Sequence, residues 1–446
     1  MKKWSTSSSV TLANKYKYPI FAIWAILVVF YVRYKAPVIW QADWTHDDLM
    51  NCYRAMETPW RTMLLDTLMF WKPSNLFRPL GEIFYKLLWE QFGFTALPWR
   101  LAIGTVLIAN AFILGHLANR LSGSMAVGLA ATAIASFHSL WSHLYLNTGT
   151  VYEIFACTFV YAGLAYYVEF RDPYFTTVLL ILGLNSKESA IVLPVLIVLY
   201  EWIWNKRTPW IFCGLAGGVC LAFIFGRIYV PGGLTTIGNY QPVYSIGSYT
   251  ERFRGYFGPL ILWKQIPYWA LPIAALPLLL RNKQATYSAF LFPIAILPLA
   301  FVPDRGLEGV YIACAALPLA LSSTLLLIPK ETWRTVGAAI LFLLTALWMP
   351  GAYSMDGWDR EQHEIRAFHE SLKQLAPTLP KGSQIRFISE PFNEDVPWAS
   401  TFATRLLYSD PSILVISPNN PHTKSIPEDR DFASFGWRDN KLYRIK

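Results

Sequence analysis

Residues 98–118 read PWRLAIGTVLIANAFILGHLA, and Arg100 is the only Lys, Arg, Asp or Glu among them. A helix crosses the hydrocarbon core of a bilayer with about 20 consecutive, mostly apolar residues, so this stretch predicts a membrane-spanning helix. The whole chain has a similar character, since 54% of its residues are hydrophobic and only 15% are charged, against about 25% charged residues in soluble proteins. This composition excludes a disordered or fibrous chain and almost every water-soluble enzyme. It predicts a polytopic membrane protein.

Further apolar runs along the chain bring the predicted number of transmembrane helices to about eleven, in an all-α membrane region. Whether 174–184 and 189–204 form one span or two is open at this point. The predicted spans are 18–34, 98–118, 125–141, 151–168, 174–184, 189–204, 210–230, 258–279, 286–302, 309–328 and 333–352.

Lysine and arginine residues predict the orientation, because cytoplasmic loops of membrane proteins are enriched in them. With the N-terminus inside, every inside loop contains at least one of these residues, and the short outside loops contain few. This arrangement places the loops 35–97 and 231–257 outside, together with the C-terminal tail. The net charge of +9 is therefore interpreted as a topology signal and not as a nucleic-acid-binding surface.

The chain divides into two predicted domains. Residues 1–352 form the transmembrane domain and contain the excess of positive charge, whereas residues 353–446 have an ordinary soluble composition with nearly balanced charge. A helical period over 359–375 and short β-type runs at 384–388, 412–416 and 441–445 predict a small extracytoplasmic α/β domain.

Two adjacent carboxylates, Asp47 and Asp48, follow the first predicted span. Neighbouring carboxylates repel each other, so at least one tends to hold a proton or bind a cation. The pair therefore suits a general base or a divalent metal site, with Mg²⁺ or Mn²⁺ as the metal, and its structural alternative is a helix N-cap. Asp48 directly precedes Leu49 and Met50 and fits the cap better, so Asp47 is favoured as the base.

Other charged residues lie at predicted outer span ends. Arg78 could hold a phosphate or extend to lipid headgroups. Glu153 begins a span, where a carboxylate is rare. Lys187 and Glu188 lie between two apolar runs, where a charged pair is costly, and the alternative is a mutual ion pair that seals a tight turn. Arg305 belongs to another small charged group near two span ends.

Four motifs in this order resemble the GT-C superfamily of membrane glycosyltransferases. The resemblance covers about residues 15–350 and is similar to the O-mannosyltransferase-like branch and to bacterial membrane glucosyl- or mannosyltransferases. The motifs are Trp44-Thr45-His46-Asp47-Asp48, Phe77-Arg78-Pro79-Leu80, Asn185-Ser186-Lys187-Glu188-Ser189-Ala190 with Leu193-Pro194, and Glu308-Gly309-Val310-Tyr311. The last departs from the family's Arg-Tyr pattern, with Gly309-Val310 in its place.

The resemblance implies an enzyme that takes one sugar from a polyprenyl-phosphate donor on the outer face of a bacterial inner membrane. The acceptor would be a glycan, a lipid-linked glycan or a protein, and membrane lipids would surround the enzyme. On this pattern Asp47 or Asp48 is the catalytic base. The cations Arg78, Lys187 and Arg305 bind the donor phosphate. Glu188 accompanies Lys187, and Glu153 falls near the family's second acidic position.

Three other classes stay open at this point. A lipid-linked sugar transporter or flippase would need internal repeats and polar residues near the bilayer midplane, and the sequence shows neither. A polysaccharide polymerase or ligase would use a diphosphate-linked glycan and basic outer loops, and Arg252 and Arg254 in the loop 231–257 are compatible with it. A non-enzymatic scaffold is the third.

Overall fold

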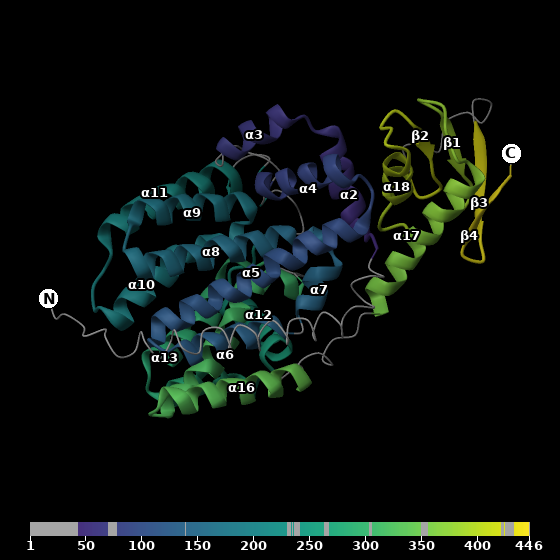
Figure 1. Ribbon diagram of the computed structural model, residues 1–446. Helices are drawn as coiled ribbons and strands as arrows, with labels where there is room; N and C mark the ends of the chain where they lie inside the picture. Colours follow the sequence, from purple (N-terminus) through teal and green to yellow (C-terminus); the bar gives the residue numbers. More distant parts are fainter. Residues whose placement is uncertain are drawn as a thin grey trace.

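The computed structural model places a helical body beside a smaller body that contains a sheet (Figure 1). The residues that it describes are 43–69, 78–138, 140–229, 233, 235, 241–262, 267–302, 306–348, 356–420, 423 and 432–445. The predicted span 18–34 and the candidate Arg305 therefore lie outside the described residues.

Three helices precede the apolar ones and lie where the two bodies meet or along the helical body (Figure 1). They are α2 (His46–Glu57), α3 (Trp60–Leu68) and α4 (Pro79–Phe92). Proline occupies the first position of α4, where its missing N–H removes no helical hydrogen bond. On α3, the apolar Leu64, Leu65 and Leu68 are exposed, as expected for a helix that lies at a membrane surface.

In the described part of the chain, four helices are long and apolar enough to cross a membrane. They are Ala96–Ser122 (α5), Thr148–Phe170, Trp210–Ile228 and Leu307–Leu327. The last three consist of η1 (Thr148–Thr150) and α8 (Val151–Phe170), of α11 (Trp210–Phe223) and η3 (Ile224–Ile228), and of η8 (Leu307–Ala315), α15 (Ala316–Ser323) and η9 (Thr324–Leu327). The remaining elements of the helical body are α6 (Met125–Ser136), α7 (Leu140–Leu146), α9 (Pro173–Ser186), η2 (Glu188–Val192), α10 (Leu193–Trp204), α12 (Ile246–Phe257), η6 (Gly258–Leu262), η7 (Tyr268–Leu280), α13 (Lys283–Ala295), α14 (Leu297–Ala300) and α16 (Glu331–Trp348).

The prediction of eleven spans is not supported. Some predicted runs outside the four long helices are divided into shorter pieces, such as 258–279, which falls into a π-helical turn and a 3₁₀ helix. The run 174–184 lies in a single helix, α9, which is only 14 residues long. Proline explains part of this division, because it removes a backbone donor and clashes with the preceding turn. Pro272 and Pro277 lie inside η7, and Pro293 lies inside α13. Apolar composition alone does not reveal these breaks.

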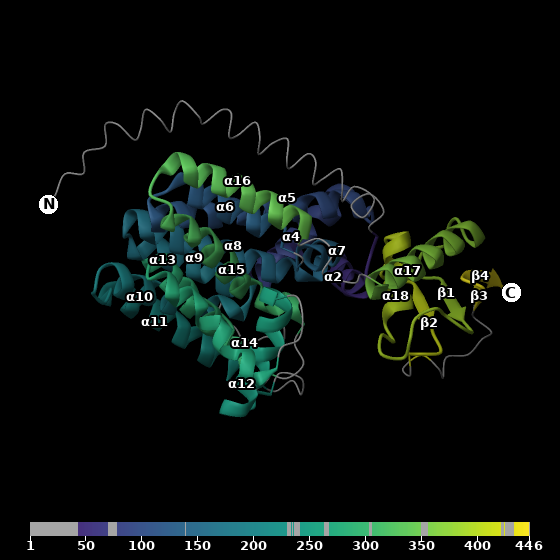
Figure 2. The same cartoon turned by 90° about the horizontal axis from the view of Figure 1, so that it is seen from below.

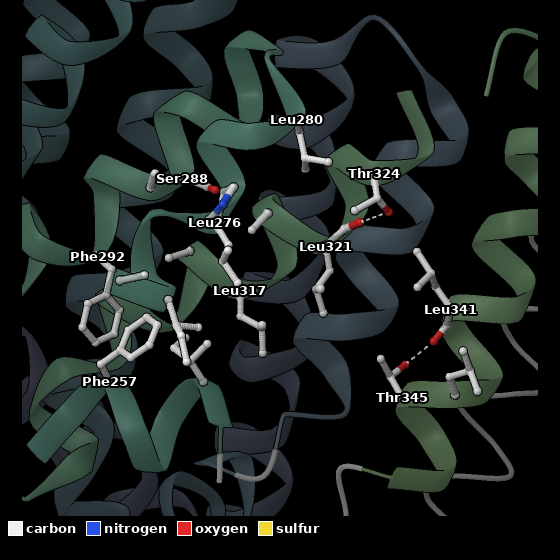
Figure 3. Close-up of a pocket in the computed structure, with 18 of the residues that line it drawn as sticks. Phe257, Leu276, Leu280, Ser288, Phe292, Leu317, Leu321, Thr324, Leu341 and Thr345 are labelled. Atoms are coloured by element: carbon white, nitrogen blue, oxygen red, sulfur yellow. Dashed lines mark hydrogen bonds between the residues drawn. The ribbon is translucent and has the colours of Figure 1, made fainter. Parts of the chain in front are cut away.

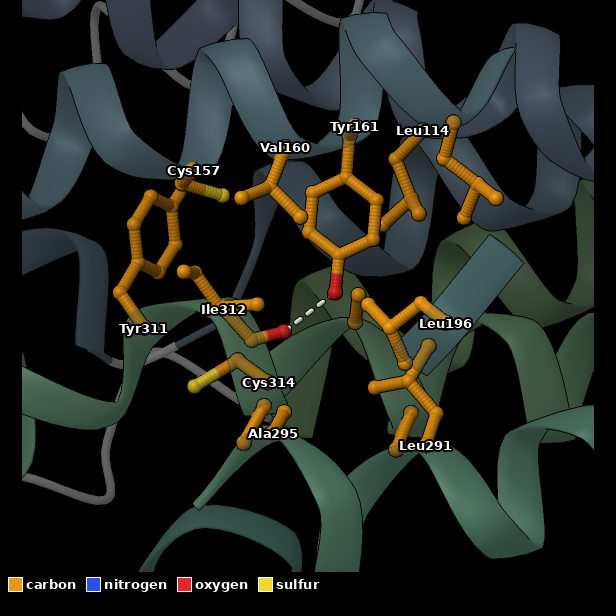
Figure 4. Packing of buried hydrophobic residues seen from close by; sticks show 14 of the residues in the cluster. Leu114, Cys157, Val160, Tyr161, Leu196, Leu291, Ala295, Tyr311, Ile312 and Cys314 are labelled. Carbon is orange, nitrogen blue, oxygen red and sulfur yellow. Dashed lines mark hydrogen bonds between the residues drawn. The ribbon is translucent and has the colours of Figure 1, made fainter. Parts of the chain in front are cut away.

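The core of the helical body joins segments far apart in the sequence. Figure 4 shows Tyr161 of α8 packed against Leu196 and Leu291 from two other helices, with its hydroxyl group donating to the carbonyl oxygen of Ile312. A buried phenol needs such a partner, because an unsatisfied hydroxyl in an apolar environment is costly. This contact fixes α8, which carries Glu153 in its first turn, against η8.

The C-terminal body contains a four-stranded sheet in the order β2-β1-β3-β4. The first two pairings are parallel and the β3–β4 pairing is antiparallel. Three strands overlap the predicted β-type runs, and β3 is the strand that the sequence did not indicate. The elements are α17 (Asp356–Leu375), β1 (Gln384–Phe387), α18 (Ala399–Tyr408), β2 (Leu414–Ile416), β3 (Ala433–Arg438) and β4 (Lys441–Arg444).

The C-terminal body contacts the helical body through α2 (Figure 2). The ring of Tyr53 stacks on Phe402 of α18 at a centroid distance of 4.4 Å, and Arg366 of α17 donates to Asp43 Oδ2 at 2.8 Å. Apolar residues of α2, including Leu49, belong to the same buried cluster as those of the sheet. The helix that carries Asp47 is thus held from both bodies.

Candidate functional site

Asp48 lies in the first turn of α2 and is fully buried. Its Oδ2 atom accepts a hydrogen bond from the backbone N–H of Thr45 at 2.8 Å, as in a capping box. The same oxygen pairs with Arg100 Nη2 at 2.9 Å, and both side chains are inaccessible to solvent. Asp48 therefore stabilises the start of α2 from the N3 position and anchors it to α5.

Asp47, the neighbouring residue, is exposed. Its Oδ2 atom accepts from Asn147 Nδ2 at 3.2 Å, and Asn51 Nδ2 donates to its backbone oxygen at 2.9 Å. Gly149 leaves room for this side chain, because a Cβ atom there would lie 2.9 Å from Asp47 Cβ. Of the two predicted carboxylates, Asp47 is the one that an external molecule can reach.

The two aspartates do not form a shared metal site. One carboxylate is buried against Arg100 and the other faces outward, so a single ion cannot contact both in this arrangement. Within the described ranges, no group of three or more His, Cys, Asp and Glu residues is arranged to hold a metal ion.

Arg78 is the N-cap residue of α4 and pairs with Glu188, which begins η2. Arg78 Nη2 lies 3.1 Å from Glu188 Oε1 and 3.3 Å from Oε2. Burial favours the neutral form of Glu188, but Arg78 and Lys187 outweigh it and lower its pKa to about 2. The carboxylate is therefore ionised at neutral pH.

Lys187 pairs with Glu153 of α8. Both residues are buried, with exposed fractions of 8% and 7%. Instead of pairing only with each other, as the alternative of a mutual pair predicts, the two residues reach different segments, since Lys187 pairs with α8 and Glu188 with the start of α4. The extended backbone of Lys187, with φ of −159°, separates α9 from η2 and lets the two side chains diverge.

Tyr152 connects these groups. The Arg78 guanidinium lies over its ring, 5.3 Å from the centroid, within the range of a cation–π contact. Its hydroxyl group donates to Asn51 Oδ1 at 2.8 Å. A Cβ atom on Gly81 would lie 2.1 Å from the Tyr152 ring, so α4 approaches α8 as closely as only glycine permits. Tyr152 thereby links Asn51 beside Asp47 to the Arg78–Glu188 pair.

Four further residues of this region were not singled out from the sequence: Arg54, Asp66, Glu82 and Arg227 (the Glu82 cluster). Arg54 Nε lies 2.7 Å from Glu82 Oε1. Arg227, buried on η3, interacts electrostatically with Glu188, Arg78, Glu82 and Asp66. Arg227 was detectable as an arginine at the end of an apolar run, where charged residues are costly and often functional. The burial of Glu82 had no such signal.

A large apolar cavity lies elsewhere in the helical body, between η7, α13, α15 and α16 (Figure 3). Its volume is about 840 Å³, and its walls include Phe257, Phe292, Leu317 and Leu321. The hydroxyl groups in its lining are already used, since Thr324 donates to Leu321 at 2.6 Å and Thr345 to Leu341 at 2.8 Å. The cavity therefore suits a hydrocarbon chain and not a polar ligand.

The fold and the charged groups define a mostly helical chain with membrane character and a buried network of ion pairs at one end of its helices. Comparison with protein-family models, with curated proteins and with solved structures found no match.

Proposed function

We propose that this protein is a membrane glycosyltransferase that moves one sugar from a polyprenyl-phosphate donor to a hydroxyl group of a glycan, a lipid-linked glycan or a protein. The observation that carries the proposal is the Arg78–Tyr152–Asn51 chain. This chain of contacts connects Arg78, a cation suited to a lipid phosphate, with α2, the helix that carries the exposed Asp47. The order of motifs in the sequence supports the same class.

Arg78 and Lys187 are the proposed phosphate ligands. The leaving group of this reaction is a polyprenyl phosphate, and cations in a site shielded from water stabilise the charge that develops on it. A guanidinium has five N–H donors, so Arg78 can contact a phosphate oxygen while it keeps its contact with Glu188. Glu188 and Glu153 would orient the two cations before the donor arrives.

Asp47 is the proposed general base. Its carboxylate is exposed and is oriented by Asn147, so it can accept the proton of an acceptor hydroxyl as the oxygen attacks the anomeric carbon. General-base catalysis of this kind contributes about 10²–10⁴-fold. Asp48 has a structural role in this proposal, because its Oδ2 atom already binds Arg100 and the backbone N–H of Thr45.

The hydrocarbon part of the donor also has a candidate location. The 840 Å³ cavity is lined almost entirely by apolar side chains, and a prenyl chain would need such a space within or beside the membrane.

Charges at the opposite end of α8 support the proposed orientation, with the N-terminus in the cytoplasm and the site outside. Glu153 lies in the first turn of α8, whereas Arg171 follows its last residue. There, Arg171 and Arg207 both pair with the buried Glu201. Arg171 and Arg207 belong to the set expected inside by the distribution of positive charge.

The test is an assay of sugar transfer by the purified protein in lipid nanodiscs. Undecaprenyl-phosphate glucose and mannose, each radiolabelled in the sugar, are supplied with an alkyl glycoside, a lipid-linked disaccharide or a serine-containing peptide. We expect loss of label from one of the donor lipids and its appearance on an acceptor or in water. Consumption of an undecaprenyl-diphosphate oligosaccharide instead, with neither monosaccharide donor used, would identify a polymerase or ligase and refute the proposal.

A further inference from the structure

Glu82 of α4 is the most unusual carboxylate near the proposed phosphate site. It is 3% exposed, and its Oε1 atom forms an ion pair with Arg54, whose Nε atom lies 2.7 Å away. Its other oxygen, Oε2, is shielded from solvent and has no hydrogen-bond partner among the described residues. A buried carboxylate oxygen without a donor is unfavourable, whereas the protonated form would carry a hydrogen that it can donate to a ligand.

Glu82 lies one helical turn after Arg78. The backbone N–H of Glu82 donates to the Arg78 carbonyl oxygen at 3.2 Å, so both residues belong to the first turn of α4. The Tyr152 ring contacts this turn at Gly81 and lies beneath Arg78. The carboxyl group of Glu82 is therefore held in a fixed position relative to the Arg78 guanidinium.

The charges of the described residues in this region balance when every group is ionised. The cations are Arg54, Arg78, Lys187 and Arg227, and the carboxylates are Asp66, Glu82, Glu153 and Glu188. A neutral network of this kind attracts a phosphate only weakly. Neutralising one carboxylate leaves a net positive charge in a poorly solvated site, where a phosphate is attracted more strongly.

The environment of Glu82 favours its neutralisation. Burial raises the pKa of Glu82 to about 7, with Asp66 acting in the same direction and Arg54 and Arg227 opposing it. Among the described residues, the groups that interact with it electrostatically from the surrounding elements are Arg54 of α2, Asp66 of α3, Tyr152 of α8 and Arg227 of η3. At neutral pH the carboxyl group is thus close to half protonated.

We propose that Glu82 is a proton-linked phosphate-binding residue: it takes up a proton from solvent when a polyprenyl phosphate binds at Arg78, and its Oε2–H completes the anion site. This inference rests on the proposed function, because it concerns the same lipid phosphate. It adds a ligand that carries no permanent charge and makes donor affinity depend on pH.

The probe for the test is undecaprenyl phosphate, which all donors of this class share. Its affinity for the protein in nanodiscs is measured between about pH 6 and pH 8.5 for the wild type, for Glu82→Gln and for Glu90→Gln. Glu90 is an exposed carboxylate of the same helix and is the matched control. The phosphate group of the lipid titrates near pH 6, and this contribution is common to all three proteins.

We expect wild-type affinity to fall by up to tenfold per pH unit above pH 7, and Glu90→Gln to behave in the same way. Glu82→Gln, which is permanently neutral, should keep at pH 8.5 an affinity close to that at pH 7. Equal pH profiles for the wild type and Glu82→Gln would overturn the proposal.

A second measurement uses only the wild type, in case Glu82→Gln does not fold. Calorimetric titrations at about pH 7.5 in two buffers of different ionisation enthalpy give the number of protons taken up per lipid bound. We expect uptake of about three-quarters of a proton per site, because a carboxyl group with a pKa of about 7 is already about one-quarter protonated at this pH. Binding without uptake would refute the role of Glu82. A wild type that does not bind undecaprenyl phosphate at any pH would refute the proposed function itself, so the two failures are distinguishable.

Discussion

Replacing Asp47 and Asp48 separately by asparagine should affect different properties of the protein, although the two residues are neighbours. Asp48 is fully buried, accepts from Thr45 at 2.8 Å and pairs with the fully buried Arg100 at 2.9 Å. Asp47 is exposed, and its side chain accepts a hydrogen bond from Asn147. The two substitutions are the same size and remove the same charge, so each is the matched control for the other.

The magnitudes follow from these environments. Asp48→Asn leaves the Arg100 guanidinium buried without a counter-charge, and breaking a buried ion pair in this way costs about 3–5 kcal/mol. That is a large part of a typical folding free energy of about 5–15 kcal/mol. Asp47→Asn should change stability by less than about 0.5 kcal/mol, as for most surface substitutions. It should lower the rate of sugar transfer by about 10²–10⁴-fold, because the amide cannot accept the acceptor's proton.

Two assays on the same detergent-purified samples separate the effects. Thermal unfolding reports stability, and single-turnover transfer from the donor lipid reports chemistry at saturating donor. The double variant Asp48→Asn/Arg100→Met should be less destabilised than Asp48→Asn alone, since it removes the uncompensated charge. Wild-type stability of Asp48→Asn would contradict the buried-pair argument. Wild-type transfer by Asp47→Asn would remove Asp47 from the chemistry and direct attention to Glu153.

Three further outcomes are expected. Lys187→Met should raise the donor KM and also destabilise the protein, because Glu153 loses its partner. Adding Glu153→Gln to this variant should restore stability in thermal unfolding without restoring the donor KM. Recovery of both stability and KM would show that the Lys187–Glu153 pair is purely structural. Glu188 has a pKa of about 2 in the folded protein against an ordinary value of 4.5, so its contribution to stability is present above pH 4.5 and is lost as the pH falls towards 2. Glu188→Gln should therefore show a weaker loss of stability in that window, and an unchanged acid profile would show that Glu188 is not the group responsible. A phosphatase fused after Lys446 should be active in bacterial cells and a cytoplasmic reporter silent, and the reverse result would invalidate the proposed orientation.

The sequence predicted those parts of the fold that are determined by a local pattern of residues. Apolar runs predicted the helical body, and short β-type runs predicted three of the strands, β1, β2 and β4. β3 was missed because its sequence, ASFGWR, contains a glycine and no Val, Ile or Thr, and so has a weak local strand pattern. Its place in the sheet is set by pairing with β1 and β4. Eleven spans are not supported among the described residues, in part because proline and short 3₁₀ or π-helical turns divide apolar runs that a hydropathy pattern treats as continuous.

The candidate site shows a similar limit. The sequence identified charged residues that are costly in apolar surroundings, but it did not identify their partners. Lys187 and Glu188 are adjacent, yet their partners come from α8 and from the start of α4. Which carboxylate meets which cation depends on the packing of helices, and no local rule sets it. Glu82 was overlooked because it is buried only in the folded chain, where groups of α2, α3 and η3 interact with it.

These ion pairs also explain how the site can keep a fixed geometry although part of it lies on η2, a short 3₁₀ helix. An unpaired charge in a buried position is expensive, so each buried cation holds its carboxylate partner in place strongly. The Arg78–Glu188 and Lys187–Glu153 pairs therefore attach η2 to α4 and to α8, and the Tyr152–Asn51 hydrogen bond attaches α8 to α2. A displacement of η2 is thereby transmitted through α8 to the helix that carries Asp47. On this reasoning, the charges proposed to bind the donor phosphate also set the position of the proposed base, so substitutions at Arg78 or Glu188 should alter transfer rate as well as donor affinity.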